Sequence, residues 1–378
     1  MSPPSATSWR WLRTGDEAFA AMLAAIEAAQ ESIRLEVYIY ADSPLGVKFL
    51  EALLAARERG VAVRVLVDAL GSFTMSDSFW QPLRDAGGVA KLFNPIALKR
   101  MGIRNHRKLL VCDDEIAFVG GFNIAPEYEG NGVARGWKDL GMSLEGSLVA
   151  QLAASFDEMF ELADFQHKRF PRLRRFALKR AKGNASEQLL LSGPGRGFNP
   201  IRRALQKDLH VANSAQIIVA YFLPTGRLWR AFGRVARRGG TMQLVLAGKT
   251  DVVLSQLAAQ SLYRRLLKAG VEIHEYEPQI LHAKLFVIDD IVYVGSANLD
   301  PRSLGINYEL MLRIKNPTMA AEAREIINET LHNSRQIVWP EWKRTRTLWS
   351  RLKRRWAHFI LARVDPFVAH RQWMWLPE

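Results

Sequence analysis

The two halves of this chain repeat one another, and that duplication limits the possible folds more than any other feature. The runs IRLEVYIY at 33–40 and GVAVRVLVD at 60–68 return as QIIVAYFL at 216–223 and GTMQLVLAG at 240–248. The order is the same in both halves, and the offset stays near 180 residues. Self-similarity at a fixed offset indicates one structural unit present twice. We therefore predict two copies of a single domain.

Each half alternates β-rich runs with stretches of helical periodicity. Continuous apolar runs such as VRVLV and KLLVC are typical of strands in a sheet whose two faces are both covered. Residues 18–29 and 45–59 carry apolar side chains at helical spacing. The predicted fold class is therefore α/β, as two duplicated α/β units. Cys112, the chain's single cysteine, is expected to be a buried strand residue.

Both halves contain the pattern His-x-Lys-x-x-x-x-Asp. Its residues are His106, Lys108, Asp113, His282, Lys284 and Asp289. In a strand, residues i and i+2 share a face, so each histidine projects beside its lysine. Two lysines supply positive charge for phosphate oxygens, and two histidines supply a nucleophile and an acid/base near neutral pH. The pattern predicts phosphodiester cleavage through a covalent phosphohistidine.

A Gly-small-x-Asn sequence follows each motif and brings small residues beside the His-Lys pair. The backbone there can approach a ligand closely, because little side chain intervenes. These candidate phosphate-contacting residues are Gly120, Gly121, Asn123, Gly295, Ser296 and Asn298. Asp113 and Asp289 lie an odd number of residues past the lysines and face the other side of an ideal strand. They are better interpreted as structural anchors than as acids that touch a substrate.

No metal site or cofactor is expected, because the two lysines would repel a cation. The chain has a net charge of +14, and this excess is confined to two segments. Residues 168–182 hold eight Lys or Arg and no acid, and residues 340–378 hold nine against three acids. The rest of the chain is neutral. A basic protein usually meets an anionic partner, either nucleic acid or a lipid surface.

The C-terminal segment is also rich in tryptophan. Trp342, Trp349, Leu352, Trp356 and Phe359 recur at steps of three, four or seven, so on one helix they share a face. A basic helix with an aromatic face is typical of an interfacial membrane anchor. The alternative is a helix that packs this face onto the protein's own core. The two interpretations are compatible if only part of the face is covered.

The paired His-Lys-Asp motifs resemble those of the phospholipase D superfamily. Within it the chain resembles bacterial phospholipase D-type cardiolipin synthases, in phrases such as LEVYIY, NHRKLLVCDDEIAFVGGFN, AYFLPTG and GSANLDPRSLGINYEL. The similarity covers roughly residues 15–330. It implies two phospholipase D-like α/β sandwich domains that share a central active site. The expected division is domains at 1–165 and 196–338, a basic linker at 166–195 and a membrane-interface tail at 339–378.

The resemblance also implies roles in a ping-pong phosphatidyl transfer. By analogy His106 is the nucleophile and His282 the general acid/base, although the reverse remains open. The residues expected to hold the phosphoryl oxygens are Lys108, Lys284, Asn123 and Asn298. A carboxylate downstream of each motif usually orients a histidine, and Asp139 and Glu309 stand there. The first motif departs from the family, since Gly121 replaces the usual serine, so contact there is expected from backbone alone.

The expected partners are phospholipid substrates and an anionic membrane surface, with no nucleic acid. The expected location is peripheral, at the cytoplasmic face of a bacterial inner membrane, and the oligomeric state stays open. A phospholipid hydrolase, a nuclease and a non-enzymatic membrane-binding protein are the alternatives. Lys99, Arg100, Arg104 and Arg107 gather near the first motif and would suit either a nucleic acid or an anionic headgroup. The concentration of tryptophan in the tail favours lipid.

Overall fold

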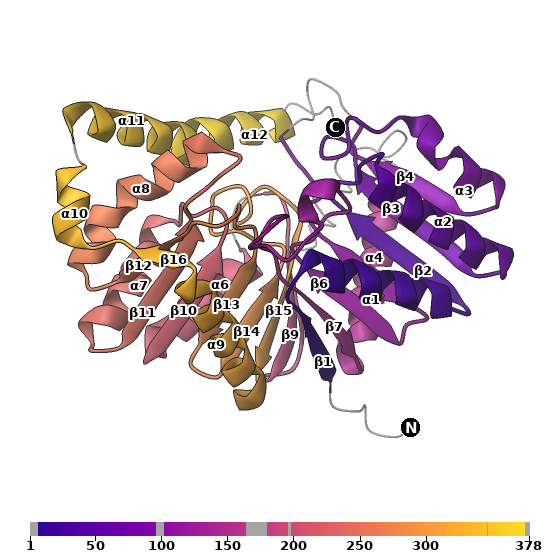
Figure 1. Ribbon diagram of the computed structural model, residues 1–378, viewed down its shortest axis with the longest axis horizontal. Helices are drawn as coiled ribbons and strands as arrows, with labels where there is room; N and C mark the ends of the chain where they lie inside the picture. The colour runs from indigo at the N-terminus through magenta and orange to yellow at the C-terminus, as the bar shows by residue number, and fades with distance from the viewer. Residues whose placement is uncertain (1–6, 96–101, 164–179, 196–197, 346, 375–378) are drawn as a thin grey trace.

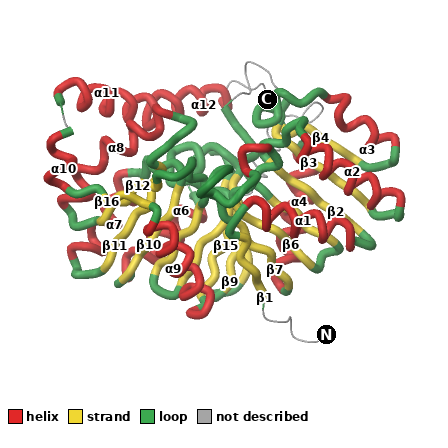
Figure 2. The backbone as a smooth tube through the Cα atoms, viewed as in Figure 1, coloured by secondary structure: helices red, strands yellow, loops and turns green. Residues whose placement is uncertain are grey.

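The strands of the computed structural model form two mixed sheets, one in each half of the chain (Figures 1 and 2). The structure describes residues 7–95, 102–163, 180–195, 198–345 and 347–374. The first sheet consists of β1 (Ser8–Leu12), β2 (Ser32–Val37), β3 (Ala62–Asp68), β4 (Val89–Phe93), β5 (Leu109–Cys112), β6 (Ile116–Gly120) and β7 (Gly141–Glu145). Its spatial order is β1-β7-β6-β5-β2-β3-β4.

The second sheet repeats this order. It consists of β8 (Arg180–Gly183), β9 (Glu187–Ser192), β10 (Ser214–Val219), β11 (Thr241–Ala247), β12 (Glu272–Tyr276), β13 (Lys284–Ile288), β14 (Ile291–Gly295), β15 (Glu309–Lys315) and β16 (Ser334–Gln336). Its order is β16-β12-β11-β10-β13-β14-β15-β9-β8, so the run β7-β6-β5-β2-β3-β4 returns as β15-β14-β13-β10-β11-β12. In each half the last three strands of that run are mutually parallel, and the others are antiparallel. The predicted duplicated α/β fold is confirmed.

Helices cover the outer face of each sheet. In the first half these are α1 (Gly15–Ala28), α2 (Pro44–Glu58) and the short α3 (Gln81–Asp85). In the second half they are α6 (Pro200–Val211), α7 (Gly226–Arg237) and α8 (Val253–Lys268). The helix starts follow from local sequence, because α2 and α6 each begin with a proline behind a capping side chain. Ser43 accepts from Gly46 N–H, and Asn199 accepts from Arg202 N–H.

A third hydrophobic core joins the two halves. The inner faces of both sheets pack there with α4 (Ser147–Leu162) and α9 (Pro317–His332). Leu109 and Val111 of β5 belong to this core together with Leu285 and Val287 of β13. β5 and β13 are the middle strands of their sheets. The segments that carry the two motifs therefore lie where the halves meet.

The segment expected to be a linker differs from the prediction in its second part. Residues 180–192 form β8 and β9, and β9 pairs with β15 of the second sheet. Leu189 and Leu191 of β9 are buried in the core that the two halves share. The three consecutive leucines of QLLLS, all buried, suit a strand whose two faces are both covered and explain this incorporation into the sheet. Residues 164–179, which hold most of the basic run, lie outside the described residues.

The C-terminal tail is helical and lies against α8 (Figure 1). It consists of α10 (Trp339–Arg344), α11 (Leu348–Phe359), a π-helical turn (Ile360–Val364) and α12 (Asp365–Met374). Trp342 is buried on α10, with its ring 4.9 Å from that of Tyr263. On α11, Ala357 is fully buried, and His358 Nδ1 lies 2.9 Å from Ser261 Oγ.

The other apolar side chains of α11 remain in solvent. Trp349, Leu352, Trp356 and Phe359 are between 58 and 64% exposed. The prediction that Trp342 shares their face is wrong, because Thr347 caps a new helix and separates α10 from α11. One part of the tail thus packs on the protein, and another part presents an apolar face to solvent. No helix among the described residues is long and apolar enough to cross a bilayer.

Candidate active site

Each motif histidine is held by the opposite half of the chain. The backbone N–H of His106 donates to Tyr308 O at 3.0 Å, and that of His282 donates to Lys138 O at 2.7 Å. The residue that follows Tyr308 and the residue that follows Lys138 each carry a carboxylate, which contacts the imidazole. His106 Nδ1 lies 3.0 Å from Glu309 Oε2, and His282 Nδ1 lies 2.6 Å from Asp139 Oδ2.

These contacts define the protonation state of the two rings. A carboxylate at Nδ1 accepts that nitrogen's proton, so the Nε2 lone pair of each neutral imidazole is left for chemistry. Burial lowers the pKa of His106 and of His282 below the ordinary value, and the ammonium of Lys284 lowers that of His282 further. Both rings are therefore neutral at neutral pH. Neutral imidazole is the form that can attack phosphorus or take up a proton.

The motif lysines lie directly beside the histidines. Lys108 Nζ donates to His106 O at 2.8 Å, and Lys284 Nζ lies 2.9 Å from His282 Nδ1 and 3.1 Å from His282 Nε2. Burial lowers the pKa of Lys108 to about 7 and that of Lys284 to about 8, and the charge of Lys284 contributes to the shift of Lys108. An anion placed between the two ammonium groups would relieve this electrostatic cost.

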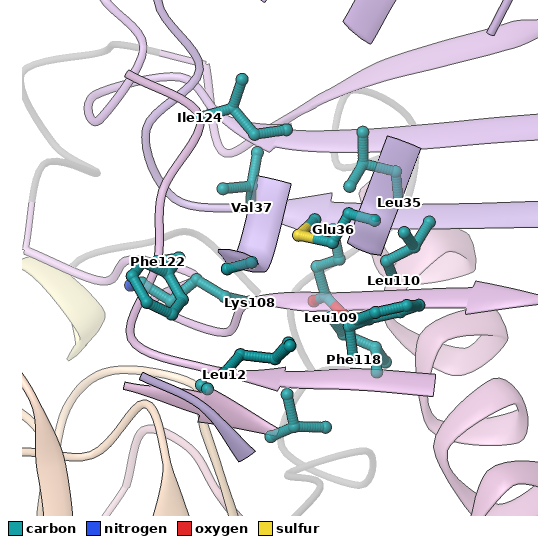
Figure 3. Close-up of a pocket in the computed structure, with 15 residues that line it drawn as sticks. Leu12, Leu35, Glu36, Val37, Lys108, Leu109, Leu110, Phe118, Phe122 and Ile124 are labelled. Atoms are coloured by element: carbon teal, nitrogen blue, oxygen red, sulfur yellow. The ribbon is translucent and has the colours of Figure 1, made fainter. Parts of the chain in front are cut away.

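The side chain of Lys108 passes through an apolar part of the first half. It lines a cavity of about 30 Å³ together with Leu12, Val37, Phe118 and Phe122 (Figure 3). That cavity has room for about one water molecule and lies away from the two histidines. The apolar walls explain the low pKa of the lysine, because they replace the water that would solvate its charge.

One larger pocket of about 710 Å³ contains both histidines. Asn123 and Asn298 also line it. The Tyr38 ring lies 5.1 Å from that of His106, while the rings of Tyr128 and Trp137 lie 5.3 and 5.6 Å from that of His282. Sequence reasoning missed these three aromatic residues. Trp137 stands two positions before Asp139, and only the crossed contact to the other half's histidine reveals its place.

The tail forms part of the pocket wall. Leu361, Asp365, Val368 and Ala369 line the pocket. Asp365 accepts from Arg302 Nε at 2.7 Å and from a second guanidinium nitrogen at 2.6 Å. This two-bond ion pair fixes the start of α12 against the wall of the second half. The apolar tail and the pocket with both histidines are therefore contiguous.

The two motif asparagines hold neighbouring backbone. Asn123 Oδ1 accepts from Ile39 N–H at 3.0 Å, and Asn298 Oδ1 accepts from Tyr221 N–H at 3.3 Å. Each contact fixes the amide so that its nitrogen is the remaining donor. In Asn123 this nitrogen donates to the Tyr128 hydroxyl at 2.6 Å.

The small residues expected at the phosphate are placed differently. A Cβ on Gly121 would lie 2.0 Å from Asp139 Oδ1, and one on Gly295 would lie 2.2 Å from Leu310 O. A Cβ on Gly120 would lie 2.5 Å from Gly141 Cα. The Ser296 hydroxyl donates to Glu309 Oε2. Phosphate contact at these four positions stays a prediction. In the structure Gly121 makes room for Asp139, Gly120 and Gly295 pack on neighbouring backbone, and Ser296 binds Glu309.

The motif aspartates lie at the far ends of their strands from the lysines. Asp113 accepts from the backbone N–H groups of Gln30, Glu31 and Ser32, each at 2.8 Å. Asp289 accepts from Asn213 and Ser214 in the same way. Both carboxylates hold the chain where it enters the first central strand of each half, so their inclusion among the catalytic residues stays a prediction that these contacts do not support. The interpretation as structural anchors matches these contacts.

The arginines near the first motif are buried. Arg107 pairs with Glu36 at 3.0 Å, and Arg104 lies 3.5 Å from Asp68. Both residues are at most 2% exposed, so neither forms part of an exposed basic surface, although Arg104 lines the pocket that contains the two histidines. Lys99 and Arg100 lie outside the described residues. Among the residues that the structure describes, no cluster of three or more His, Cys, Asp or Glu could hold a metal ion.

Two repeated mixed sheets bring two motif histidines to one shared pocket, each with its motif lysine beside it, and this arrangement defines a phospholipase D-like protein. The family model described as "Cardiolipin synthase, PLD-like domain" matches residues 22–160 and 205–331. The chain is 34% identical to the "Major cardiolipin synthase ClsA" of Bacillus subtilis, over 90% of this chain and 72% of that protein. It is 32% identical to the "Cardiolipin synthase B" of Salmonella typhi, over 97% of this chain and 89% of that protein.

A solved structure shows the same fold. The phosphatidylserine synthase of Haemophilus influenzae Rd KW20 superposes with a TM-score of 0.73 over 97% of each chain, at 14% identity. The family model and the relatives above show more than the fold. The chain belongs to the cardiolipin synthase family of phospholipase D-like proteins.

Proposed function

We propose that this chain is a phosphatidyltransferase that makes cardiolipin from phosphatidylglycerol and a second phosphatidyl lipid. The observation that carries the proposal is the crossed pairing of His106 with Glu309 and of His282 with Asp139. This pairing presents two neutral imidazoles to one pocket and sets an ammonium beside each. Names of the relatives support cardiolipin as the product.

In the first step His106 Nε2 attacks the phosphorus of one phospholipid. The bond from phosphorus to the headgroup alcohol breaks, and the protonated His282 gives its proton to the departing oxygen. The incoming phosphate favours this protonation, because an anion next to an imidazole raises its pKa. The product is a phosphatidyl group bound to His106 and a free alcohol.

In the second step the glycerol hydroxyl of phosphatidylglycerol takes the place of the departed alcohol. His282 takes the hydroxyl proton, the oxygen bonds to phosphorus, and the bond to His106 breaks. The charge of the transition state lies on the nonbridging oxygens, for which Lys108 and Lys284 supply fixed positive charge. The amide nitrogens of Asn123 and Asn298 are the proposed neutral donors.

The exposed apolar face of α11 is the proposed membrane contact. Trp349 and Trp356 are amphipathic rings suited to the headgroup level, and Arg351, Lys353 and Arg355 lie exposed on the same helix. Each basic residue near an anionic leaflet adds about 1 kcal/mol to binding. We place the enzyme peripherally at the cytoplasmic face of a bacterial inner membrane. A nuclease is less well supported, because Arg104 and Arg107 are buried in ion pairs.

The test is product analysis on vesicles. Purified protein is incubated with phosphatidylglycerol, with and without phosphatidylethanolamine, and the lipids are followed by mass spectrometry. Cardiolipin is the expected product, and the His106→Ala variant should form none. Phosphatidic acid without cardiolipin would replace the transferase with a phospholipid hydrolase.

A further inference from the structure

The two halves differ at a turn that faces the pocket. Asn123 and Asn298 occupy matching positions, because the residue after each forms the same type of parallel bridge within its own half. Two residues beyond each asparagine, the first half has Ala125, whereas the second half has Asp300. Asp300 lines the pocket. The second half therefore has a carboxylate at the position where the first half has a methyl group.

A second difference lies before the orienting carboxylates. Trp137 and Asn307 match, because the residue after each bridges the residue that precedes the other half's histidine. Both line the pocket. Trp137 presents a ring to His282, so the first half contributes an aromatic wall. The second half contributes an amide in its place.

These two polar groups have unused hydrogen-bonding capacity. Asn307 is 8% exposed, and its Oδ1 has no partner among the described residues. The Asp300 carboxylate accepts from the backbone N–H of Ser303, at 2.7 Å through Oδ1, and from that of Arg302, which still leaves lone pairs for a ligand. Burial raises the pKa of Asp300 to about 6, so above that pH its carboxylate only accepts hydrogen bonds. A buried polar atom without a partner, such as Asn307 Oδ1, destabilises the empty pocket, and a ligand that binds it removes this cost.

The chemistry of these groups restricts the ligand. Phosphate oxygens at neutral pH only accept hydrogen bonds, so they cannot satisfy the Asp300 carboxylate. Hydroxyl and ammonium groups both can. The amide of Asn307 offers a donor and an acceptor, and a hydroxyl can use both, whereas an ammonium group can use only the acceptor. A headgroup with more than one hydroxyl fits the pair best.

We infer that Asp300 and Asn307 form a subsite for the second hydroxyl of a polyol acceptor, the glycerol headgroup of phosphatidylglycerol. This inference rests on the proposed function. One glycerol hydroxyl gives its proton to His282 and bonds to phosphorus as the bond to His106 breaks. Asp300 accepts a hydrogen bond from the neighbouring hydroxyl and takes no proton. The subsite thereby favours glycerol over water as the acceptor.

The test measures how the covalent intermediate divides between glycerol and water. Phosphatidylglycerol vesicles are incubated with deuterated glycerol, and the ratio of labelled phosphatidylglycerol to phosphatidic acid is determined. Asp300→Ala should lower this ratio at least about tenfold, because a site built to bind a hydroxyl discriminates strongly once that partner is lost. Asp300→Asn, which keeps one acceptor oxygen, should give a ratio between that of the wild type and that of Asp300→Ala.

Asp251→Ala is the matched control. Asp251 also lines the pocket, but both of its oxygens already accept from the Tyr221 hydroxyl, each at 2.8 Å. Its loss should change the ratio by no more than about twofold. Release of p-nitrophenol from bis(p-nitrophenyl) phosphate, which brings no polyol, shows that each variant is folded and active.

The outcomes separate the inference from the proposed function. An unchanged ratio in Asp300→Ala, with a wild type that transfers, overturns the subsite alone. A wild type that forms phosphatidic acid without transfer product overturns the proposed function and the subsite with it. With ethanolamine as acceptor, a larger loss than with glycerol would show that the site binds an ammonium group and would overturn the hydroxyl assignment.

Discussion

At the scale of single residues, the two halves solve the same problem with different side chains. Asp139 reaches His282 past Gly121, where any Cβ would collide with its carboxylate. Glu309 carries one more methylene, and the Ser296 hydroxyl fixes it on His106. The departure at Gly121 is visible in the sequence. Its cause was not predictable, because it depends on a carboxylate whose histidine partner lies 143 residues away.

Lysine charge should determine the alkaline limit of activity. A lysine whose pKa is about 7 or 8 loses its charge as the pH rises through that window. With bis(p-nitrophenyl) phosphate, whose leaving group needs no acid, kcat/KM should therefore fall between about pH 7 and pH 8. Equal kcat/KM at pH 7 and pH 9 would contradict this assignment. Lys108→Arg, which stays charged, should weaken the decline in whatever activity it retains.

At the scale of elements, the motif aspartates fasten the hairpins to the sheet. Asp113 and Asp114 both adopt positive φ in the turn between β5 and β6, at 55° and 57°. Asp113 accepts from three backbone N–H groups, whereas Asp114 pairs with Arg34 at a half-exposed site. The odd spacing from the lysines predicted this separation from the site. Incorporation of β8 and β9 into the second sheet was not predictable, since basic residues dominate the neighbouring sequence.

The adjacent pair offers a controlled test. Asp113→Ala should lower the free energy of unfolding by about 1 kcal/mol more than Asp114→Ala does, because three backbone N–H groups at the start of β2 lose their acceptor. The backbone cost of alanine at positive φ is shared by both variants. Denaturant unfolding measures the difference, and diester cleavage at saturating substrate should stay near the wild-type rate. A tenfold loss of kcat in Asp113→Ala, at unchanged stability, would show that Asp113 takes part in catalysis.

At the scale of the whole molecule, neither half contains a complete site. Each histidine takes its carboxylate from the other half, and a common core holds the halves together. The resemblance to the phospholipase D superfamily implied a shared site from the sequence alone. The crossed contacts needed the three-dimensional arrangement. In the tail, Trp342 packs on the protein and Trp349 and Trp356 are exposed, so both interpretations of the segment stay compatible and its membrane contact stays a prediction. Asp365 ties the same segment to the pocket wall.

The exposed tryptophans should govern membrane binding without affecting chemistry. Trp349→Ala with Trp356→Ala should weaken binding to phosphatidylglycerol vesicles at least about tenfold, since two indole rings contribute well over the ~1.4 kcal/mol that a tenfold change requires. Cleavage of the soluble diester should be unchanged. Trp342→Ala is the contrasting variant, because this buried ring should affect thermal stability instead. Equal vesicle binding in the double variant would place the membrane contact elsewhere.

The covalent intermediate is the central claim, and one measurement addresses it directly. In His282→Ala, bis(p-nitrophenyl) phosphate can still phosphorylate His106, because its leaving group needs no acid, but the adduct has lost the base that activates the second acceptor. We predict a burst of p-nitrophenol equal to the enzyme concentration, and peptide mass spectrometry should find the phosphoryl adduct on His106. The His106→Ala variant should show neither burst nor adduct. An active enzyme that forms no adduct on either histidine would contradict the account.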